Sequence, residues 1–102
     1  DPADLERKIG PRSKAVILVN MSGAMGRNDL IAEICRKHDL RLLEDCAQAI
    51  GASLKGRPSG SYGDIGIYSF QLNKNMTSGE GGLMVTEDAD LYRRCVALHD
   101  LG

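Results

Sequence analysis

The 102-residue chain predicts an α/β fold, in which a mostly parallel sheet is flanked by helices. An apolar run at residues 15–19 is bounded by polar residues, which is typical of a strand buried on both faces of such a sheet. Apolar residues with a helical period of 3.6 follow this run, and a second short strand follows the helix. Strand, helix and strand within about 30 residues make one βαβ unit, whose strands are parallel with a right-handed crossover.

Composition limits the classes of protein and partner. With 42% apolar and 26% charged residues, the chain is expected to form one soluble globular domain over residues 1–102. A net charge of −1 lacks the clustered basic excess that meets nucleic-acid phosphates, so no nucleic-acid partner is expected. No membrane partner is expected either, because no run of about 18 apolar residues and no signal-peptide pattern is present. We therefore expect a cytoplasmic protein.

The three cysteines are expected to be buried free thiols. Cys35, Cys46 and Cys95 are odd in number, far apart in the chain and placed in apolar stretches. This pattern suits neither a disulfide framework nor a zinc site. We predict no metal site.

The first half of the chain carries two helix patterns. Residues 2–9 begin with proline and acidic residues and end with basic ones, which predicts a short helix stopped by Gly10 and Pro11. The second helix is expected to be capped by Asn28 or Asp29 and to end at 37–39. Its apolar residues are Leu30, Ile31, Ile34 and Cys35.

The second half continues with strands, turns and a last helix. Residues 40–46 are expected to form the second strand. A loop at 51–63, with a small hairpin at about 53–58, leads to strands at 65–70 and 83–86. A final helix is expected to open at Asp88, Ala89 and Asp90, with Leu91, Cys95 and Leu98 on one face.

Polar residues at the carboxyl ends of strands are the candidates for a site, because open α/β sheets bind ligands there. Asp45 ends the second strand and Gln48 follows three residues later. Two interpretations of Asp45 stay open: a carboxylate that contacts a ligand, or the cap of a short helix at residues 47–50.

A hydroxyl and an amine follow the next strand. Ser69 lies at the end of the strand at 65–70, and Lys74 comes five residues later, before the glycine-rich turn 79–82. A loop lysine is usually a solvated charge, but in a partly desolvated pocket its amine can act as a nucleophile. The turn itself matches neither the P-loop nor the dinucleotide-binding pattern.

These motifs together resemble the DegT/DnrJ/EryC1/StrS family of sugar aminotransferases, which are pyridoxal-phosphate enzymes with the aspartate-aminotransferase fold. The resemblance is carried, in order, by Glu44-Asp45-Cys46-Ala47-Gln48-Ala49, Gly63-Asp64-Ile65-Gly66, Ser69-Phe70, Lys74-Asn75 and Gly79-Glu80-Gly81-Gly82. It extends over nearly the whole chain. It implies a three-layer large domain, of which this chain would be the central portion.

The resemblance also implies a role for each matched residue. Lys74 corresponds to the catalytic lysine that forms a Schiff base with the cofactor pyridoxal 5′-phosphate. Asp45 corresponds to the carboxylate that pairs with the protonated pyridine nitrogen, and Gln48 to the residue near the 3-hydroxyl. Ser69 corresponds to the hydroxyl that binds the phosphate. Some relatives that dehydrate sugars carry histidine at the position of Lys74, so lysine favours amino transfer.

The resemblance implies a reaction that moves an amino group from glutamate or glutamine to a keto sugar, which we expect to be nucleotide-linked. It also implies that the complete enzyme is a homodimer. Two other interpretations are open. One is a non-catalytic α/β binding module that keeps the fold without the activity. The other is a receiver-type domain, which needs an acidic pair on an early strand, whereas the first strand here is followed by Asn20.

Overall fold

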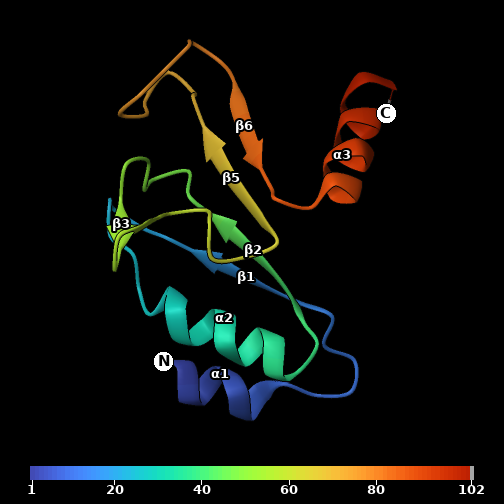
Figure 1. Cartoon of the computed structure of the whole chain (residues 1–102). Coiled ribbons are helices and arrows are strands. Elements are labelled where there is room, and N and C mark those ends of the chain that lie inside the picture. The colour runs from blue at the N-terminus through green and yellow to red at the C-terminus, as the bar shows by residue number, and fades with distance from the viewer. Residues whose placement is uncertain (102) are drawn as a thin grey trace.

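The computed structural model describes residues 1–101, with side chains described as far as residue 99. Figure 1 shows the arrangement of the helices and strands. In chain order these are α1 (Pro2–Lys8), β1 (Ala15–Val19), α2 (Asn28–Lys37), β2 (Arg41–Asp45), β3 (Ser53–Leu54), β4 (Arg57–Pro58), β5 (Ile65–Ser69), β6 (Gly82–Val85) and α3 (Ala89–Leu101).

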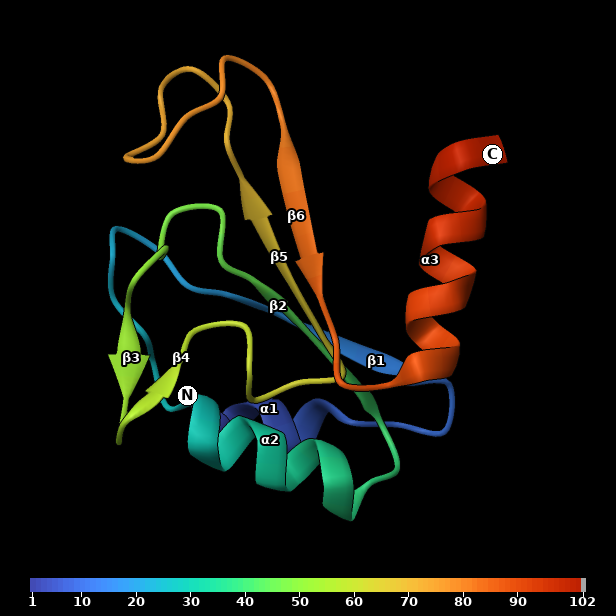
Figure 2. The same cartoon turned by 45° about the horizontal axis from the view of Figure 1, so that its top comes forward.

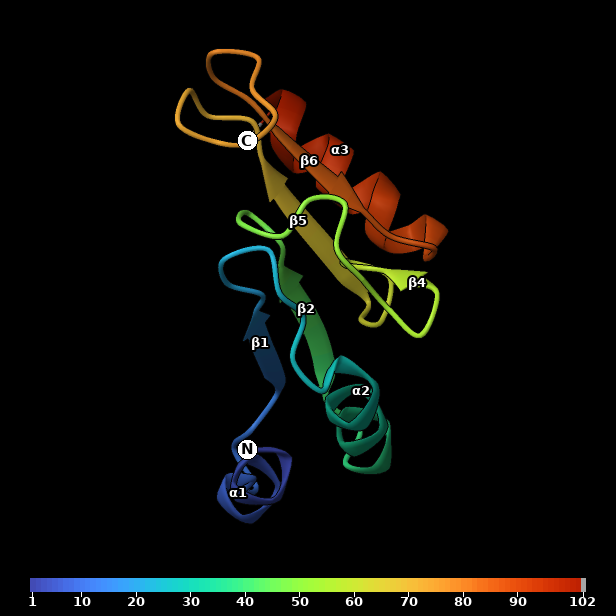
Figure 3. The same cartoon turned by 90° about the vertical axis from the view of Figure 1, so that its left-hand side faces the viewer.

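The central sheet has the strand order β1-β2-β5-β6. Strands β1, β2 and β5 are parallel, and β6 is antiparallel to β5, which confirms the prediction of a mostly parallel sheet. In the register of the parallel strands, Val19 lies beside Asp45, and Asp45 beside Ile67. The three parallel strands therefore end at one common edge, as Figure 3 shows.

Helices α1 and α2 lie side by side and cover one face of the sheet (Figure 2). The core forms between α2 and this face, because the inward residues of β2 and α2 are apolar. Its buried members are Ala32, Cys35, Leu40 and Leu42, with Ile9, Val16, Leu18, Ile31 and Tyr62 packed around them. Each fully buried leucine of this kind stabilises the fold by about 1.5–3 kcal/mol.

The opposite face is largely open, so the prediction that the first strand is buried on both sides is wrong for the described residues. Ile17 is 67% exposed and Val19 49% exposed. The reason is that α1 and α2 both lie on the other side of the sheet. Among the described elements only α3 reaches this side, where Leu91 shares a cavity with Leu43 and Ile65.

Helix α3 begins as the sequence predicts. Asp88 Oδ1 accepts hydrogen bonds from the backbone N–H groups of Asp90 and Leu91, at 2.8 and 3.1 Å, and so caps the first turn. The predicted apolar face is correct at Leu91 and Cys95, which are half-buried. It is wrong at Leu98, which is 71% exposed, because α3 stands away from the rest of the chain beyond its first turns (Figure 1).

The segment 47–50 forms turns, so the predicted short helix is absent. Ala49 N–H donates to the Cys46 carbonyl at 2.9 Å, and Ala52 N–H donates to the Ala49 carbonyl at 3.1 Å. Gly51 has a φ of +79°, in the left-handed region that stops a right-handed helix. The chain therefore reverses direction at Gly51, and no helix forms at residues 47–50.

The small predicted hairpin is confirmed. Strands β3 and β4 are antiparallel, and the residues between them, Lys55 and Gly56, have φ values of 53° and 77°. Positive φ at both central positions is typical of the type I′ turn that suits a two-residue hairpin. Lys55 Nζ binds Asp29 Oδ2 at 2.7 Å, which ties the hairpin to α2.

The start of α2 differs from the prediction in the role of Asn28. The helix begins at Asn28 itself, and the residue in the N-cap position, Arg27, makes no side-chain capping bond. The side chain of Asn28 is buried and donates to Glu44 Oε2 at 2.9 Å. The Asn28 amide therefore binds Glu44 on the covered face of the sheet and does not cap the helix.

No helix in the described part of the chain is long and apolar enough to cross a membrane.

Candidate functional site

A cavity of about 440 Å³ lies at the edge where the three parallel strands end. Residues that follow each of the three strands line it: Ser22 and Gly23 after β1; Ala47, Gln48 and Ile50 after β2; Ser69, Asn73, Lys74 and Asn75 at and after the end of β5. The volume is in the range of small-molecule sites, and the position is the one at which open α/β sheets bind ligands. The fold therefore brings the predicted Gln48, Ser69 and Lys74 together.

Asp45 lies beside this group but is not among the cavity-lining residues. It is the last residue of β2 and is half-buried, on the same face of the sheet as Ile67 and Ser69. Its Oδ1 accepts a hydrogen bond from Ala47 N–H at 3.0 Å, while Oδ2 has no hydrogen-bond partner within residues 1–99. The capping bond expected of Asp45 does form, in a turn, and it leaves one oxygen available.

Lys74 stands in the loop between β5 and β6, which extends past the ends of both strands (Figure 1). The base of the loop is closed by Phe70 N–H on the Gly81 carbonyl at 2.8 Å, and by Ser78 N–H on the Phe70 carbonyl at 3.0 Å. A further turn forms where Lys74 N–H donates to the Gln71 carbonyl at 2.9 Å. The loop is therefore ordered by its own backbone, and the lysine has a defined place in it.

The lysine side chain is half-buried, and its amine takes part in none of the ion pairs among the described side chains. Gly81 lies seven residues further on, with a φ of +157°. A Cβ there would lie 2.6 Å from Ser78 Oγ, so a side chain at Gly81 would require the Ser78 hydroxyl to move.

Gln48 is exposed at the mouth of the cavity, but both its side chain and its backbone are held. Ser22 N–H donates to Gln48 Oε1 at 3.2 Å, and Gly23 N–H donates to the Gln48 carbonyl at 2.7 Å. Ser69 Oγ accepts from Gln71 N–H at 3.4 Å, a long bond that leaves the hydroxyl able to bind elsewhere.

Glu44, on the opposite face of β2 from Asp45, forms a second polar centre, which its place in the Glu44-Asp45 motif did not predict. Its side chain is fully buried, and each of the two carboxylate oxygens accepts two hydrogen bonds. Oε1 accepts from the N–H groups of Tyr62 and Gly63, at 2.6 and 2.9 Å. Oε2 accepts from Gly60 N–H at 3.1 Å and from the Asn28 amide at 2.9 Å. Glu44 therefore fixes the segment 60–63 and α2 to β2.

The spacing of β2 contained a signal for this role. Leu42 and Glu44 lie at alternate positions of the strand, and alternate residues share a face, so the carboxylate had to point into the core with Leu42. A buried carboxylate needs donors. Gly60 and Gly63 supply two of the donors through their backbone N–H groups, and Tyr62 and Asn28 supply the other two. A Cβ at Gly63 would lie 2.5 Å from the Leu42 carbonyl oxygen, so this close approach of the segment to β2 requires glycine.

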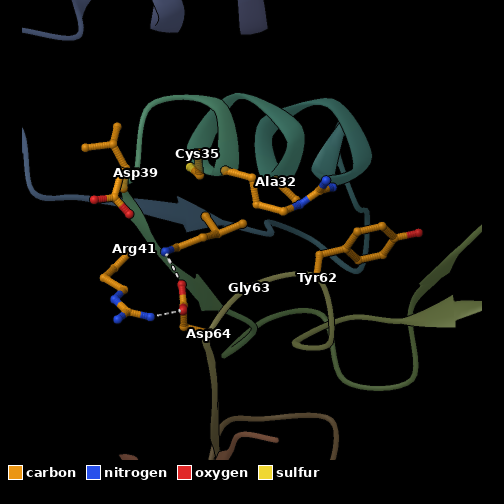
Figure 4. A pocket seen from close by; sticks show the side chains of 10 residues that line it. Ala32, Cys35, Asp39, Arg41, Tyr62, Gly63 and Asp64 are labelled. Carbon is orange, nitrogen blue, oxygen red and sulfur yellow. Dashed lines mark hydrogen bonds and ion pairs between the residues drawn. The ribbon is translucent and has the colours of Figure 1, made fainter. Parts of the chain in front are cut away.

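A different cavity, of about 340 Å³, lies at the other end of the strands, between α2 and the start of β2 (Figure 4). Asp64 joins its walls: Oδ1 binds Arg41 Nη1 and Oδ2 accepts from Leu42 N–H, both at 2.7 Å. Burial by itself raises the pKa of Asp64, but the hydrogen bond from Leu42 and the ion pair with Arg41 together lower it below its ordinary value. None of the predicted site residues lies here.

The three cysteines are all free thiols. Cys35 and Cys46 are buried free thiols, as predicted, and burial raises the pKa of both. Cys95 is a free thiol and only half-buried. Within the described residues, no group of three or more His, Cys, Asp or Glu side chains could hold a metal ion.

Comparison with known proteins agrees with this geometry. The profile of the DegT/DnrJ/EryC1/StrS aminotransferase family matches residues 1–102. A relative from Acidithiobacillus ferrooxidans, a UDP-N-acetyl-3-dehydro-alpha-D-glucosamine 3-aminotransferase, is 46% identical over 101 residues, which is 98% of this chain and 27% of that protein.

Two solved structures have the same fold. The aminotransferase TlmJ from Streptoalloteichus hindustanus gives a TM-score of 0.95 at 37% identity, over 99% of this chain and 28% of that one. An E. coli GDP-4-keto-6-deoxy-D-mannose-3-dehydratase with bound hydrated PLP gives a TM-score of 0.87 at 29% identity, over 95% of this chain and 25% of that one. The chain thus spans about a quarter of the length of the proteins it matches.

Proposed function

The chain belongs to the DegT/DnrJ/EryC1/StrS aminotransferase family, and from this membership we propose that it is the central portion of the large domain of a longer, pyridoxal-phosphate-dependent sugar aminotransferase. The observation that carries the proposal is the cavity at the carboxyl edge of the sheet, where Gln48, Ser69 and Lys74 meet next to Asp45. These four residues are the proposed cofactor-binding set, with Lys74 as the catalytic residue.

The donors and acceptors at this edge fit the chemical groups of pyridoxal 5′-phosphate. The Lys74 amine suits an aldehyde, the Ser69 hydroxyl suits a phosphate, and the free oxygen of Asp45 suits a protonated ring nitrogen. The amide of Gln48 suits the 3-oxygen. When bound, the cofactor supplies an aldehyde that condenses with amines and a ring that withdraws electrons from the bond being broken.

Asp45 would tune the cofactor through charge. Its Oδ1 is held by Ala47 N–H, which fixes the plane of the carboxylate and turns Oδ2 away from that bond. A carboxylate in this half-buried place stabilises a proton on the ring nitrogen, because opposite charges at short range favour the charged form. Electron withdrawal by the ring depends on that proton.

Lys74 would act twice on the reacting atoms. Its amine would hold the cofactor by condensing with the aldehyde carbon, with loss of water. As a free amine beside an amino donor's α-carbon, it would also be able to take up the α-proton and return it at another carbon position. A histidine in its place could move a proton but could not hold the aldehyde.

The proposed substrates are a keto sugar, nucleotide-linked, and glutamate or glutamine as amino donor. Two of the relatives support the sugar class, because the UDP-sugar aminotransferase and the GDP-keto-sugar dehydratase are both named for sugars joined to a nucleotide. We further propose a homodimer in the cytoplasm, without nucleic-acid or membrane partners.

The test is reductive labelling of the full-length protein. The protein is loaded with pyridoxal 5′-phosphate and reduced with borohydride, and the modified peptide is mapped. We expect the label on Lys74 and none in the Lys74→Ala variant. Lys55→Ala is the matched control, since Lys55 is paired with Asp29 outside the cavity. Labelling of another lysine would refute the assignment, and labelling without amino transfer would favour the non-catalytic module.

A further inference from the structure

The turn after β1 has a geometry that directs two backbone amides at one residue, Gln48. Ala24 N–H donates to the Met21 carbonyl at 2.9 Å, and the two central residues, Ser22 and Gly23, have φ values of 55° and 77°. Positive φ at both central positions is typical of a type I′ turn. The two central N–H groups are not used within the turn and donate instead to Gln48.

These two bonds fix both the backbone and the side chain of Gln48. Gly23 N–H binds its backbone carbonyl at 2.7 Å, and Ser22 N–H binds its side-chain Oε1 at 3.2 Å. An amide side chain has one oxygen that accepts and one nitrogen that donates. Since Ser22 N–H can only donate, the oxygen of Gln48 must face the turn, and Nε2 then faces away from it. Within residues 1–99, Nε2 has no hydrogen-bond partner.

We propose that the turn 21–24 is a positioning element that presents Gln48 to the cavity as a hydrogen-bond donor. This inference rests on the proposed function, in which the acceptor is the 3-oxygen of pyridoxal phosphate. That oxygen carries negative charge in the bound cofactor, so a donor stabilises it and a second acceptor would repel it. Ser22 and Gly23 act through backbone atoms only, and through Gln48.

The experiment is a double-mutant cycle read out as cofactor affinity. The apo form of the full-length protein is titrated with pyridoxal 5′-phosphate, and the dissociation constant is measured by equilibrium dialysis. Ser22→Pro removes the N–H and cannot adopt a φ of 55°. Gln48→Ala removes the side chain that the N–H holds. Met21→Ala changes a side chain of the same turn and keeps both central amides.

We expect Ser22→Pro to weaken affinity about three- to tenfold, the value of one neutral hydrogen bond. In the Gln48→Ala background the same change should cost less than about twofold, because the group it positions is gone. Met21→Ala should bind as the wild type does. A loss that is equal in both backgrounds would overturn the proposal, since a merely structural role of the turn predicts that result.

Gln48→Glu keeps the test decisive if Ser22→Pro does not fold. Glutamate retains an oxygen for Ser22 N–H but replaces the Nε2 donor by an acceptor, so affinity should fall at least about tenfold. Wild-type affinity in Gln48→Glu would refute the donor orientation. Binding by the wild type together with an additive cycle rejects this inference alone, whereas no binding by the wild type rejects the proposed function as well.

Discussion

On β2, the covered face of the sheet holds Glu44, and the open face holds Asp45, one residue further along the chain. Glu44 is fully buried and accepts four hydrogen bonds, two on each oxygen. Asp45 is half-buried and, within residues 1–99, accepts one hydrogen bond, on Oδ1. The same functional group is thus saturated with donors on one face and has an unused oxygen on the other.

The difference shows how to separate a structural carboxylate from one that is available for a ligand. A carboxylate whose lone pairs are all matched by fixed donors can bind nothing further, and its loss leaves those donors unpaired. A carboxylate with an unused oxygen at the ligand-binding edge of the sheet contributes little to the fold and can contribute much to chemistry. Asp64, with one donor on each oxygen, stands between the two.

The largest expected effect is on folding, at Glu44. Glu44→Ala leaves three backbone N–H groups and the Asn28 amide without an acceptor, which should destabilise the protein by about 4–5 kcal/mol. Glu44→Gln should cost less, about 1–3 kcal/mol. Asn28 Oδ1 has no partner in the described residues, so a rotated Asn28 amide can accept from the new Nε2.

Urea unfolding of the full-length protein and its two Glu44 variants measures this difference. Glu87→Gln, a change at an exposed glutamate on the loop before α3, serves as the control. Equal stability of the wild type and Glu44→Ala would show that Glu44 is not the structural carboxylate that distinguishes the covered face from the open one.

The second effect is on catalysis, at Asp45. Asp45→Asn keeps the cap on Ala47 N–H, because asparagine caps about as well as aspartate, so stability should change little. In the proposed role, loss of the charge would remove an ion pair with the ring nitrogen, and breaking a buried ion pair typically costs about 3–5 kcal/mol. Single-turnover amino transfer should therefore fall by about a hundredfold to a few thousandfold. A rate within about threefold of wild type would make Asp45 a capping residue only.

A smaller effect, with a pH dependence, is expected at Asp64. Because its pKa in the folded protein is lowered, its ionised form stabilises the fold above the ordinary aspartate pKa of about 3.9. This contribution is lost as the pH falls through the lowered folded-state pKa. Asp64→Asn should cost about 1–2 kcal/mol at pH 7, and the difference from wild type should shrink below about pH 4. A difference that is independent of pH in a denaturation series would contradict the role of its charge.

The smallest effect concerns the thiols on the covered side of the sheet. Cys35 and Cys46 are buried, and burial raises the pKa of both, so little thiolate is present at neutral pH. A thiol reagent should modify them only as fast as the protein unfolds, while Cys95 on α3 is only half-buried and should react earlier. Peptide mapping after a short exposure gives the order of modification, and early labelling of Cys46 would contradict the closed packing around Glu44.

Local patterns were sufficient to predict most elements and the site candidates. The 3.6-residue period, the apolar runs and the helix-ending residues placed α1, α2, β1, β2, β5, β6 and α3 within one or two residues. The carboxyl ends of the parallel strands then had to meet at one edge, which brought Gln48, Ser69 and Lys74 together. Roles for these residues came from the resemblance to a family, and their assignment here is a proposal.

Contacts between distant segments could not be predicted in the same way. Asn28 has the residue type and position of a helix cap, but its partner is Glu44, sixteen residues away, and that contact exists only after the sheet and α2 pack. The turn at 47–50 depends on a positive φ at Gly51, and the exposure of Ile17 depends on which face the helices cover. Periodicity encodes which residues share a face, because it follows from backbone geometry. Which oxygen keeps an unused lone pair is decided by tertiary structure. Donors from four separate positions must first converge on Glu44, whereas among the described residues one donor, Ala47 N–H, reaches Asp45.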